Sequence, residues 1–274
     1  MHNGMVLTDL DGTFLNSAGQ ISPTNLDTLH HLGQNGVIRV AATGRTLHSS
    51  REVVPHNLPF DYLIFSTGAG ICSFADDNVI CSHELQEADI HALAEFFLGC
   101  GIDFSIHHPI PENHRFHWYA SPNPTPDLLS RLKYLKDFAM QGNYRDISRA
   151  TQFLAISLNG LEIIDDLRNK FAHLSIIRTT SPIDGQHVWI EVFPGQTSKG
   201  EAASWLCRHL GIDRCHTMSI GNDYNDLAML EWTQHAFVVE NSPADMRQRF
   251  KGAPRNDEHG FSVAARSWLQ ILNK

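Results

Sequence analysis

The chain has 274 residues, 42% of them hydrophobic, and a formal net charge of -9. This length allows a large buried core and exceeds the usual size of one domain, so we expect one large domain or two unequal ones. The acidic balance argues against broad binding to nucleic acid or to anionic membranes, because both need a basic face. A few local cations could still bind a small anionic ligand.

The cysteines and the N-terminus indicate the compartment. The five cysteines are odd in number and include no Cys-x-x-Cys pair, which favours reduced thiols over a disulfide or zinc framework. No secretory signal precedes the first strand, and no stretch is long and apolar enough to span a bilayer. We therefore expect a cytoplasmic protein without membrane contacts. Oligomeric state is not visible in the sequence.

Strands and helices alternate in the first part of the chain. "MVLT" at 5–8 is typical of a short buried strand, and Ser22 with Pro23 predicts the start of a helix that ends before Gly36. Two more strands are predicted from "VIRVAA" at 37–42 and "YLIF" at 62–65. "STGAG", residues 66–70, is interpreted as a hinge or turn with at most backbone contact to a ligand.

The middle of the chain follows another pattern. Its apolar periodicity predicts helices at 85–99, 126–139 and 161–172, and strands at 103–108, 115–120, 153–158, 174–180 and 187–193. Short links such as "SPIDGQ", residues 181–186, favour antiparallel pairing of neighbouring strands. We therefore predict an inserted α+β domain.

Alternation resumes in the last part of the chain. Ser198 and Gly211 are predicted to bound a helix, and a strand, helix, strand and final helix are expected at 215–220, 226–232, 235–240 and 261–272. The fold expected is α/β, with a Rossmann-like, doubly wound, mainly parallel sheet as the core. The predicted boundaries are 1–82 and 190–274 for the core and 83–189 for the insertion.

Polar side chains follow the core strands where these are predicted to end. They are Asp9 and Asp11, then Thr43 to Arg45, then Thr197 to Lys199, then "GNDYND" at 221–226. Ligands of such sheets bind beyond the carboxyl ends of the strands, so these groups should meet at one edge. Two carboxylates, a hydroxyl, an ammonium and an acidic-amide cluster suit a magnesium-dependent phosphoryl-transfer site.

The four segments "DLDGT", "ATGR", "SKG" and "GNDYNDLAML" resemble, in this order, the motifs of the haloacid dehalogenase superfamily of aspartate-nucleophile phosphatases. The insertion between the second and third motifs resembles the class-two, type-B cap of the Cof-like branch. The resemblance implies that Asp9 attacks phosphorus, and that Asp11 protonates the leaving group and then deprotonates water. It also implies that the cap sets substrate specificity.

The resemblance assigns the remaining site residues as well. Leu10 and Gly44 through their backbone N–H groups, with Thr43 and Asn225, would bind the phosphoryl oxygens, and Lys199 would offset the charge shared by Asp9 and phosphate. Mg2+ would bind to the Asp9 carboxylate and the Asp11 backbone carbonyl.

The fourth motif departs from the family pattern, which usually has Gly-Asp with that Asp on the metal. Here Asn222 follows Gly221, and Asp223 comes next. Either Asn222 binds the metal through its amide oxygen, or a small backbone shift lets Asp223 take that place. Asp226 would hold the site together by hydrogen bonds.

Simpler interpretations accompany these assignments. Asp-Gly at 11–12 could be only a strand-ending turn, and Lys199 could be solvated. Thr43 could cap the following helix, and Arg45 could form a surface ion pair or contact substrate. The histidines at 107, 108, 114 and 117 match no familiar zinc spacing and are expected in a loop or on strands of the insertion.

The predicted function is hydrolysis of small phosphomonoesters, such as sugar phosphates, by a magnesium-dependent phosphatase. A phosphomutase or phosphotransferase with the same nucleophile, and a noncatalytic sensor of phosphorylated metabolites, are the alternatives. The expected partner is a small phosphorylated metabolite.

Overall fold

The chain divides into two compact units in the computed structural model, which describes residues 3–157, 160–181, 183, 187–195 and 197–272. The core unit comprises Met1–Cys81 and Ser198–Lys274, and the inserted unit comprises Ser82–Thr197. The boundary expected at 189/190 falls inside β13 (Val188–Phe193), and this whole strand belongs to the inserted unit.

The core unit is built on one eight-stranded sheet with the order β16-β15-β14-β1-β2-β3-β4-β5. Neighbouring strands from β16 to β3 run parallel, and β4 is antiparallel to β3. The predicted mainly parallel sheet is therefore confirmed, although β4, β5 and β16 had no clear sequence signal. The strands are β1 (Gly4–Thr8), β2 (Val37–Ala42), β3 (Tyr62–Phe65), β4 (Gly70–Ser73), β5 (Val79–Ser82), β14 (Thr217–Gly221), β15 (His235–Val239) and β16 (Lys251–Ala253).

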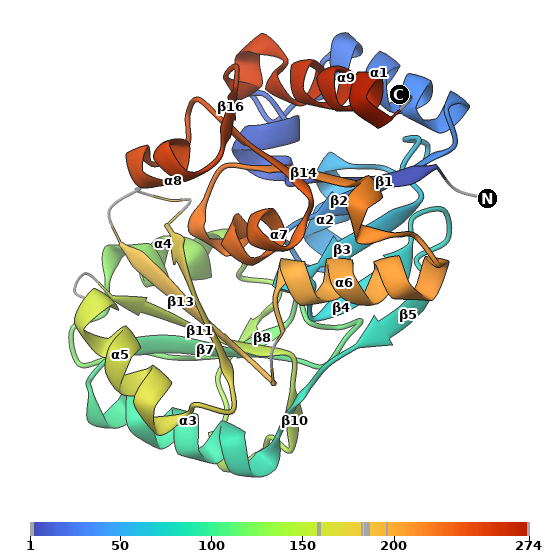
Figure 1. Ribbon diagram of the computed structural model, residues 1–274. Coiled ribbons are helices and arrows are strands. Elements are labelled where there is room, and N and C mark those ends of the chain that lie inside the picture. Colours follow the sequence, from blue (N-terminus) through green and yellow to red (C-terminus); the bar gives the residue numbers. More distant parts are fainter. Residues whose placement is uncertain (1–2, 158–159, 182, 184–186, 196, 273–274) are drawn as a thin grey trace. The chain divides into compact units, whose positions relative to one another are not determined.

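Helices cover both faces of this sheet, as a doubly wound fold requires. Figure 1 shows α1 and α9 together on one side and α6 and α7 on the other. Ser262 of α9 donates a hydrogen bond to Asn25 of α1, 2.7 Å between the two side-chain oxygens. The core helices are α1 (Pro23–Gln34), α2 (Leu47–Val53), α6 (Lys199–Leu210), α7 (Leu227–Trp232), α8 (Ala244–Arg249) and α9 (Gly260–Leu272).

The ends of the core helices follow the capping residues of the sequence. Ser22 Oγ accepts a hydrogen bond from Asn25 N at 3.1 Å, and Ser198 Oγ accepts one from Glu201 N at 3.1 Å. Gly211 ends α6 in the left-handed region with φ 66°. These three predictions are confirmed. The N-cap of α2 is Thr46 rather than Thr43, so the capping role considered for Thr43 is wrong.

The inserted unit is built on a six-stranded sheet with the order β12-β13-β11-β7-β8-β9. Its pairs are antiparallel except for β8 with β9, which confirms the antiparallel arrangement expected for this region. Of the link expected at 181–186, only Ser181 and Ile183 are among the described residues. The strands are β6 (Leu85–Gln86), β7 (Asp103–His107), β8 (Phe116–Tyr119), β9 (Ala139–Met140), β10 (Arg149–Ala150), β11 (Gln152–Ser157), β12 (Ser175–Thr180) and β13.

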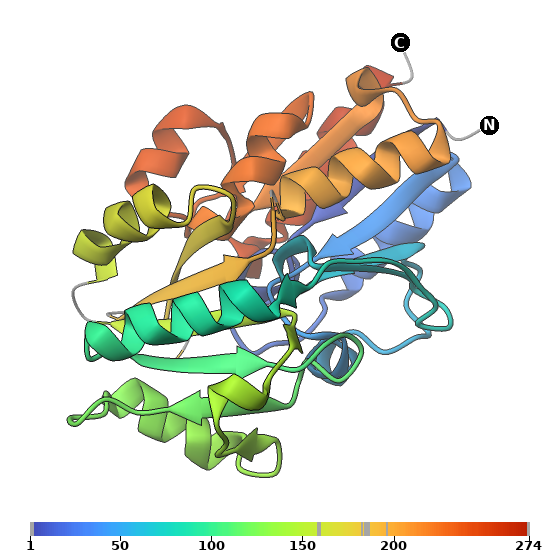
Figure 2. The ribbon, with the colours of Figure 1, turned by 90° about the horizontal axis from the view of Figure 1, so that it is seen from below.

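Three helices accompany this second sheet: α3 (Glu87–Gly99), α4 (Pro126–Tyr134) and α5 (Gly160–Lys170). Side chains of α3 and α5 form one apolar core with one face of the sheet, and both helices lie along it in Figure 2. The helix predicted for 126–139 ends at Tyr134, because the chain then turns to place β9 beside β8. Across the described ranges, no helix combines the length and apolarity needed to cross a membrane.

Candidate active site

The first motif forms a tight turn at the end of β1. Asp9 N donates to Ile220 O at 3.0 Å, which joins this end to β14. Asp11 (φ -73°, ψ 121°) and Gly12 (φ 71°, ψ 7°) have the angles of the two central residues of a type II turn. The second central position needs a positive φ, which glycine adopts without a steric penalty. The expected Asp-Gly turn is confirmed. The carboxylates of Asp9 and Asp11 therefore both lie at the end of β1.

Lys199 joins the first, third and fourth motifs. Its Nζ lies 2.7 Å from Asp9 Oδ1 and 2.6 Å from Asp226 Oδ1. The Lys199 side chain is completely buried, which excludes the solvated position considered for it. Lys199 is the first residue of α6, so the N-cap hydrogen bond of Ser198 holds the Lys199 backbone in place. The ammonium thus neutralises part of a buried cluster that has two carboxylates.

Burial dominates the electrostatics of Asp9. It raises the pKa of the Asp9 carboxyl to about 7, although the Lys199 charge acts in the opposite direction. Burial alone would lower the pKa of Lys199, but Asp226 and Asp9 together raise it above its ordinary value. Asp9 therefore lies at a position where additional positive charge would favour its ionised form.

The raised pKa of Asp9 predicts a pH-dependent stability. Between its unfolded value of 3.8 and its folded value of about 7, the folded chain binds more protons than the unfolded chain, so stability falls as pH rises. Asp9→Asn removes this dependence. In urea unfolding with a metal chelator, the free energy of unfolding of Asp9→Asn relative to wild type should rise across this pH range. A difference that stays constant with pH would contradict the assignment.

Asp226 organises the fourth motif. Its Oδ2 accepts hydrogen bonds from Asn222 N at 2.8 Å and Asp223 N at 3.2 Å, while Oδ1 binds Lys199. A Cβ on Gly221 would lie 2.5 Å from Asp226 Cγ, so glycine is needed there. The expectation that Asp226 holds this segment by hydrogen bonds is confirmed.

The side chain of Asn222 lies against the first-motif turn. A Cβ on Gly12 would lie 2.6 Å from Asn222 Nδ2, so the turn and the amide are in close contact. The oxygen and nitrogen of an amide are assigned from their surroundings, so a flipped amide would present its oxygen instead. Asp223 is the N-cap of the 3-10 turn Tyr224–Asp226 and forms a capping box with Asp226.

The second motif contacts the first and the fourth. Arg45 Nε and Nη2 each donate to the Asp11 carboxylate at 2.7 Å, a bidentate pair. This hydrogen bonding raises the pKa of Arg45. Of the two roles open for Arg45, the structure therefore shows an ion pair. Gly44 is close to Asn225, since a Cβ at residue 44 would lie 3.3 Å from Asn225 Nδ2.

Thr43 and Leu10 complete the predicted phosphoryl site. Thr8 pairs with Ala41 in register, so Asp9 and Thr43 leave neighbouring strands almost at the same level. Thr43 Oγ1 accepts from Arg45 N at 3.1 Å, and an accepting hydroxyl can still donate its own proton. Leu10 is buried and follows Asp9 directly. Asn225 Oδ1 is buried and has no hydrogen-bond partner within the described ranges.

Two contacts of this site were missed from the sequence. Residues 66–69 form a turn, as expected, whereas Gly70 already begins β4. Gly68 (φ 103°) also lies against the start of α6, where a Cβ would be 2.2 Å from Ser198 O. Asn241 Nδ2 donates to Gly12 O at 2.8 Å and so holds the first-motif turn from beyond β15. The polar "ENS" after strand 235–239 was the signal available for Asn241.

The donor set of the core unit fits a hard divalent cation. Asp9 offers a carboxylate and Asp11 offers its backbone carbonyl. Asn222, whose side chain lies against the same turn, offers an amide oxygen. Oxygen donors of this kind are those that Mg2+ prefers. The raised pKa of Asp9 is consistent with this fit, since burial disfavours its charge in the protein alone. No cluster of three or more His, Cys, Asp or Glu side chains suited to a metal occurs in the part of the chain that the structure describes.

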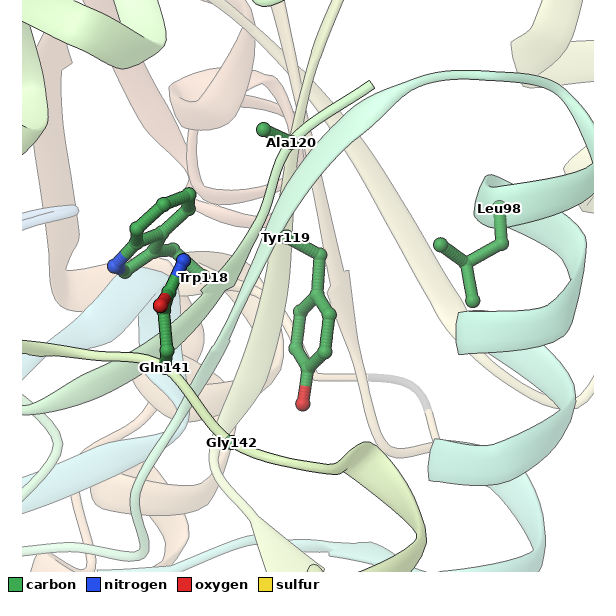
Figure 3. Close-up of a pocket in the computed structure, with 6 residues that line it drawn as sticks. All are labelled: Leu98, Trp118, Tyr119, Ala120, Gln141 and Gly142. Atoms are coloured by element: carbon green, nitrogen blue, oxygen red, sulfur yellow. The ribbon is translucent and has the colours of Figure 1, made fainter. Parts of the chain in front are cut away.

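A pocket of about 430 Å³ lies in the inserted unit and is distinct in character. Figure 3 shows the rings of Trp118 and Tyr119 on different sides of β8, with Leu98 and Gln141 at the edges. None of its six lining residues is charged, so it lacks the groups that phosphate binding needs. The pocket is therefore not the candidate active site.

Comparisons with known proteins identify similar chains over nearly the full length. The pattern of the family described as "haloacid dehalogenase-like hydrolase" matches residues 6–262. The chain is 22% identical to 5-amino-6-(5-phospho-D-ribitylamino)uracil phosphatase YwtE of Bacillus subtilis (strain 168), covering 94% of this chain and 95% of that protein. The solved structure of BT1666 from Bacteroides thetaiotaomicron has a TM-score of 0.81 at 18% identity, with 97% and 94% covered. The solved structure of the subclass IIB sugar phosphatase BT4131 has a TM-score of 0.77 at 19% identity, and the match covers 97% of this chain and 98% of that chain.

Proposed function

Because the chain belongs to the haloacid dehalogenase-like hydrolase family, we propose that it is a magnesium-dependent phosphatase of small phosphomonoesters. The observation that carries the proposal is the buried Lys199 ammonium between Asp9 and Asp226, which joins three of the four motifs in one site. Phosphatases of this superfamily generally use a divalent metal ion. The YwtE and BT4131 names, a ribityl phosphate and a sugar phosphatase, support small polyol or sugar phosphates as the substrate class.

Asp9 is the proposed nucleophile. One of its carboxylate oxygens would bond to phosphorus while the ester P–O bond breaks, giving an aspartyl phosphate and an alkoxide that takes the Asp11 proton. Asp11 would then remove a proton from water, whose oxygen attacks phosphorus and releases phosphate and the Asp9 carboxylate. In the structure both Asp11 oxygens accept from Arg45, so this bidentate contact would have to open at one oxygen before Asp11 could carry the proton that it donates.

Fixed donors of the core unit would bind the phosphoryl oxygens. We assign this role to the N–H groups of Leu10 and Gly44, the Thr43 hydroxyl, the Asn225 side chain and Lys199. The proximity of Asn225 Nδ2 to Gly44 supports an amide N–H group that can donate to a phosphoryl oxygen. A bound divalent cation would add positive charge beside the transferred phosphoryl group. The inserted unit is proposed to be the cap that determines specificity.

A leaving-group comparison tests the role of Asp11. Without its proton donor, Asp11→Asn should hydrolyse alkyl phosphates about 10²- to 10⁴-fold more slowly, because an alkoxide is a poor leaving group. With 4-nitrophenyl phosphate, the rate of the first step, formation of the aspartyl phosphate, should fall less, because nitrophenolate leaves without a proton. Burst kinetics with both substrates separate this step from the later attack of water. Equal losses in the bursts of both substrates would overturn the assignment.

The metal contact of the fourth motif can be tested by magnesium titration. We propose Asn222 as the ligand slightly ahead of Asp223, since the Asn222 amide lies against the first-motif turn. Asn222→Ala should then raise the Mg2+ concentration for half-maximal activity by about 10-fold or more, and Asp223→Ala should raise it less. Asp223 is the ligand instead if its variant shows the larger shift, and unchanged titrations for both variants exclude both assignments.

Phosphate release separates the proposal from its alternatives. The purified chain is assayed with Mg2+ against a panel of phosphorylated metabolites and ranked by kcat/KM. Release of inorganic phosphate that accounts for all consumed ester is the expected result. Phosphate recovered on an acceptor sugar indicates a phosphotransferase, and tight binding without turnover indicates a sensor.

A further inference from the structure

The inserted unit carries buried polar side chains on the sheet face opposite α3 and α5. Register pairs His107 of β7 with Gln152 of β11 and with Phe116 of β8, so these three residues share one face. The other face supplies Phe104, Ile106 and their neighbours to the apolar core. The helix α4 contributes Arg131 and Asp127 to the polar face, through contacts with His107 and Trp189.

Two aromatic rings and an imidazole contact the Arg131 guanidinium, and the buried carboxylates of Glu191 and Asp127 act on it through their charge. It lies over the Phe116 ring at 4.4 Å and the Trp189 ring at 5.7 Å from the centroids, and the residue is 9% exposed. Arg131 Nη2 donates to His107 Nε2 at 3.2 Å, and His107 Nδ1 donates to Asn113 O at 2.8 Å. Burial, followed by the Arg131 charge, lowers the pKa of His107 to about 3, so the imidazole is neutral and accepts at Nε2.

Hydrogen-bonding capacity remains around the guanidinium. Burial lowers the pKa of Arg131 to about 10, so the cation persists at neutral pH. Within the described ranges, Arg131 Nη1 is buried without a partner, and so are Asp127 Oδ1 and Gln152 Oε1. These groups share neighbours, because Asp127 Oδ2 accepts from Trp189 Nε1 at 2.5 Å and Gln152 lies beside His107 in register. Buried groups of this kind are rare in folded proteins unless something binds them.

We infer that Arg131, Asp127 and Gln152 form a binding site for neighbouring hydroxyl groups of a polyol or sugar. The unsatisfied set contains one donor and two acceptors, and a hydroxyl group both donates and accepts. A second anionic group fits less well, because the Asp127 carboxylate would repel it. The half-buried Trp189 adds an apolar surface for C–H groups. This inference rests on the proposed function in that it names the organic part of the phosphomonoester.

Two ligands of matched chain length test the site. Calorimetric dissociation constants are measured for D-glucitol 6-phosphate, which carries hydroxyls along its six carbons, and for hexyl phosphate, which has none. A metal chelator prevents hydrolysis, so the binding ratio is obtained even if the chain proves not to be a phosphatase. Wild type should bind the polyol ester about 10-fold or more tightly than the alkyl ester, because unpaired polar groups in the site disfavour the alkyl chain.

The variants are Arg131→Met, which keeps an unbranched side chain between the two rings, and Gln152→Met, which is close in volume. Both should reduce the ratio to about threefold or less. Gln152→Met decides the test if Arg131→Met does not fold. Arg145→Met, at an arginine of the same unit whose side chain is 63% exposed, should leave the ratio unchanged.

Three results would overturn the inference. A wild-type ratio near one, or a ratio that persists in both variants, means that the polar cluster holds internal water only. If Arg131→Met raises the dissociation constants of both ligands by the same factor, the guanidinium binds the phosphate group rather than hydroxyls.

Discussion

Asp9→Asn should reduce phosphate release by roughly 10⁴-fold or more, the scale on which removal of a nucleophile acts. An amide cannot form the aspartyl phosphate, and the second carboxylate on Lys199, that of Asp226, is already bound to the ammonium. The fold should survive because Asn is nearly isosteric and relieves a charge whose ionisation burial disfavours. The measurement is kcat/KM for an aryl phosphate with Mg2+, beside far-ultraviolet circular dichroism.

Asp27→Asn is the matched control for this substitution. Asp27 lies exposed on α1 in the same unit, and its conversion removes the same charge without touching the site. The control should retain wild-type kcat/KM. Activity of Asp9→Asn within about tenfold of wild type would overturn the nucleophile assignment, since nucleophile loss costs far more.

Lys199→Met should lower the free energy of unfolding by about 3–5 kcal/mol at pH 8, because it leaves two buried carboxylates without their cation. The loss should shrink toward pH 5, where the Asp9 carboxyl, whose pKa burial raises, can take up a proton in the folded variant. Activity should fall by about 10²- to 10³-fold, as for other fixed electrostatic donors. Urea unfolding at both pH values and initial-rate kinetics provide the two measurements.

A second substitution separates stability from catalysis at this position. Lys199→Met with Asp226→Asn removes one of the two uncompensated charges, so part of the lost stability should return while activity stays low. Lys251→Met, at an exposed lysine of the core unit, should change neither quantity by much. If the single Lys199 variant is as stable as wild type at pH 8, the buried ion pairs are not structurally important.

The sequence predicted those parts of the site that lie within one element or at its end. Ser22, Ser198 and Gly211 each form or end a helix through local hydrogen bonds or backbone angles, and all three were correctly placed. The Asp11–Gly12 turn was likewise local, since only residue 12 needs a positive φ. Hydrophobic periodicity was sufficient for the longer strands of both sheets but missed β4, β5, β6, β9, β10 and β16, none of which exceeds four residues.

Contacts between distant segments had to come from the tertiary structure. The sequence left Lys199 either solvated or catalytic and Arg45 either surface-paired or bound to substrate, because charge type alone does not specify a partner. Folding brings Lys199 to Asp9 across 190 positions of the chain and Arg45 to Asp11 across 34. The buried Arg131 over Phe116 had no sequence signal at all, since its environment is created by strands that follow and precede it. Local composition therefore determined the elements and the four motifs of this protein, whereas burial and pairing of its charges depended on long-range packing.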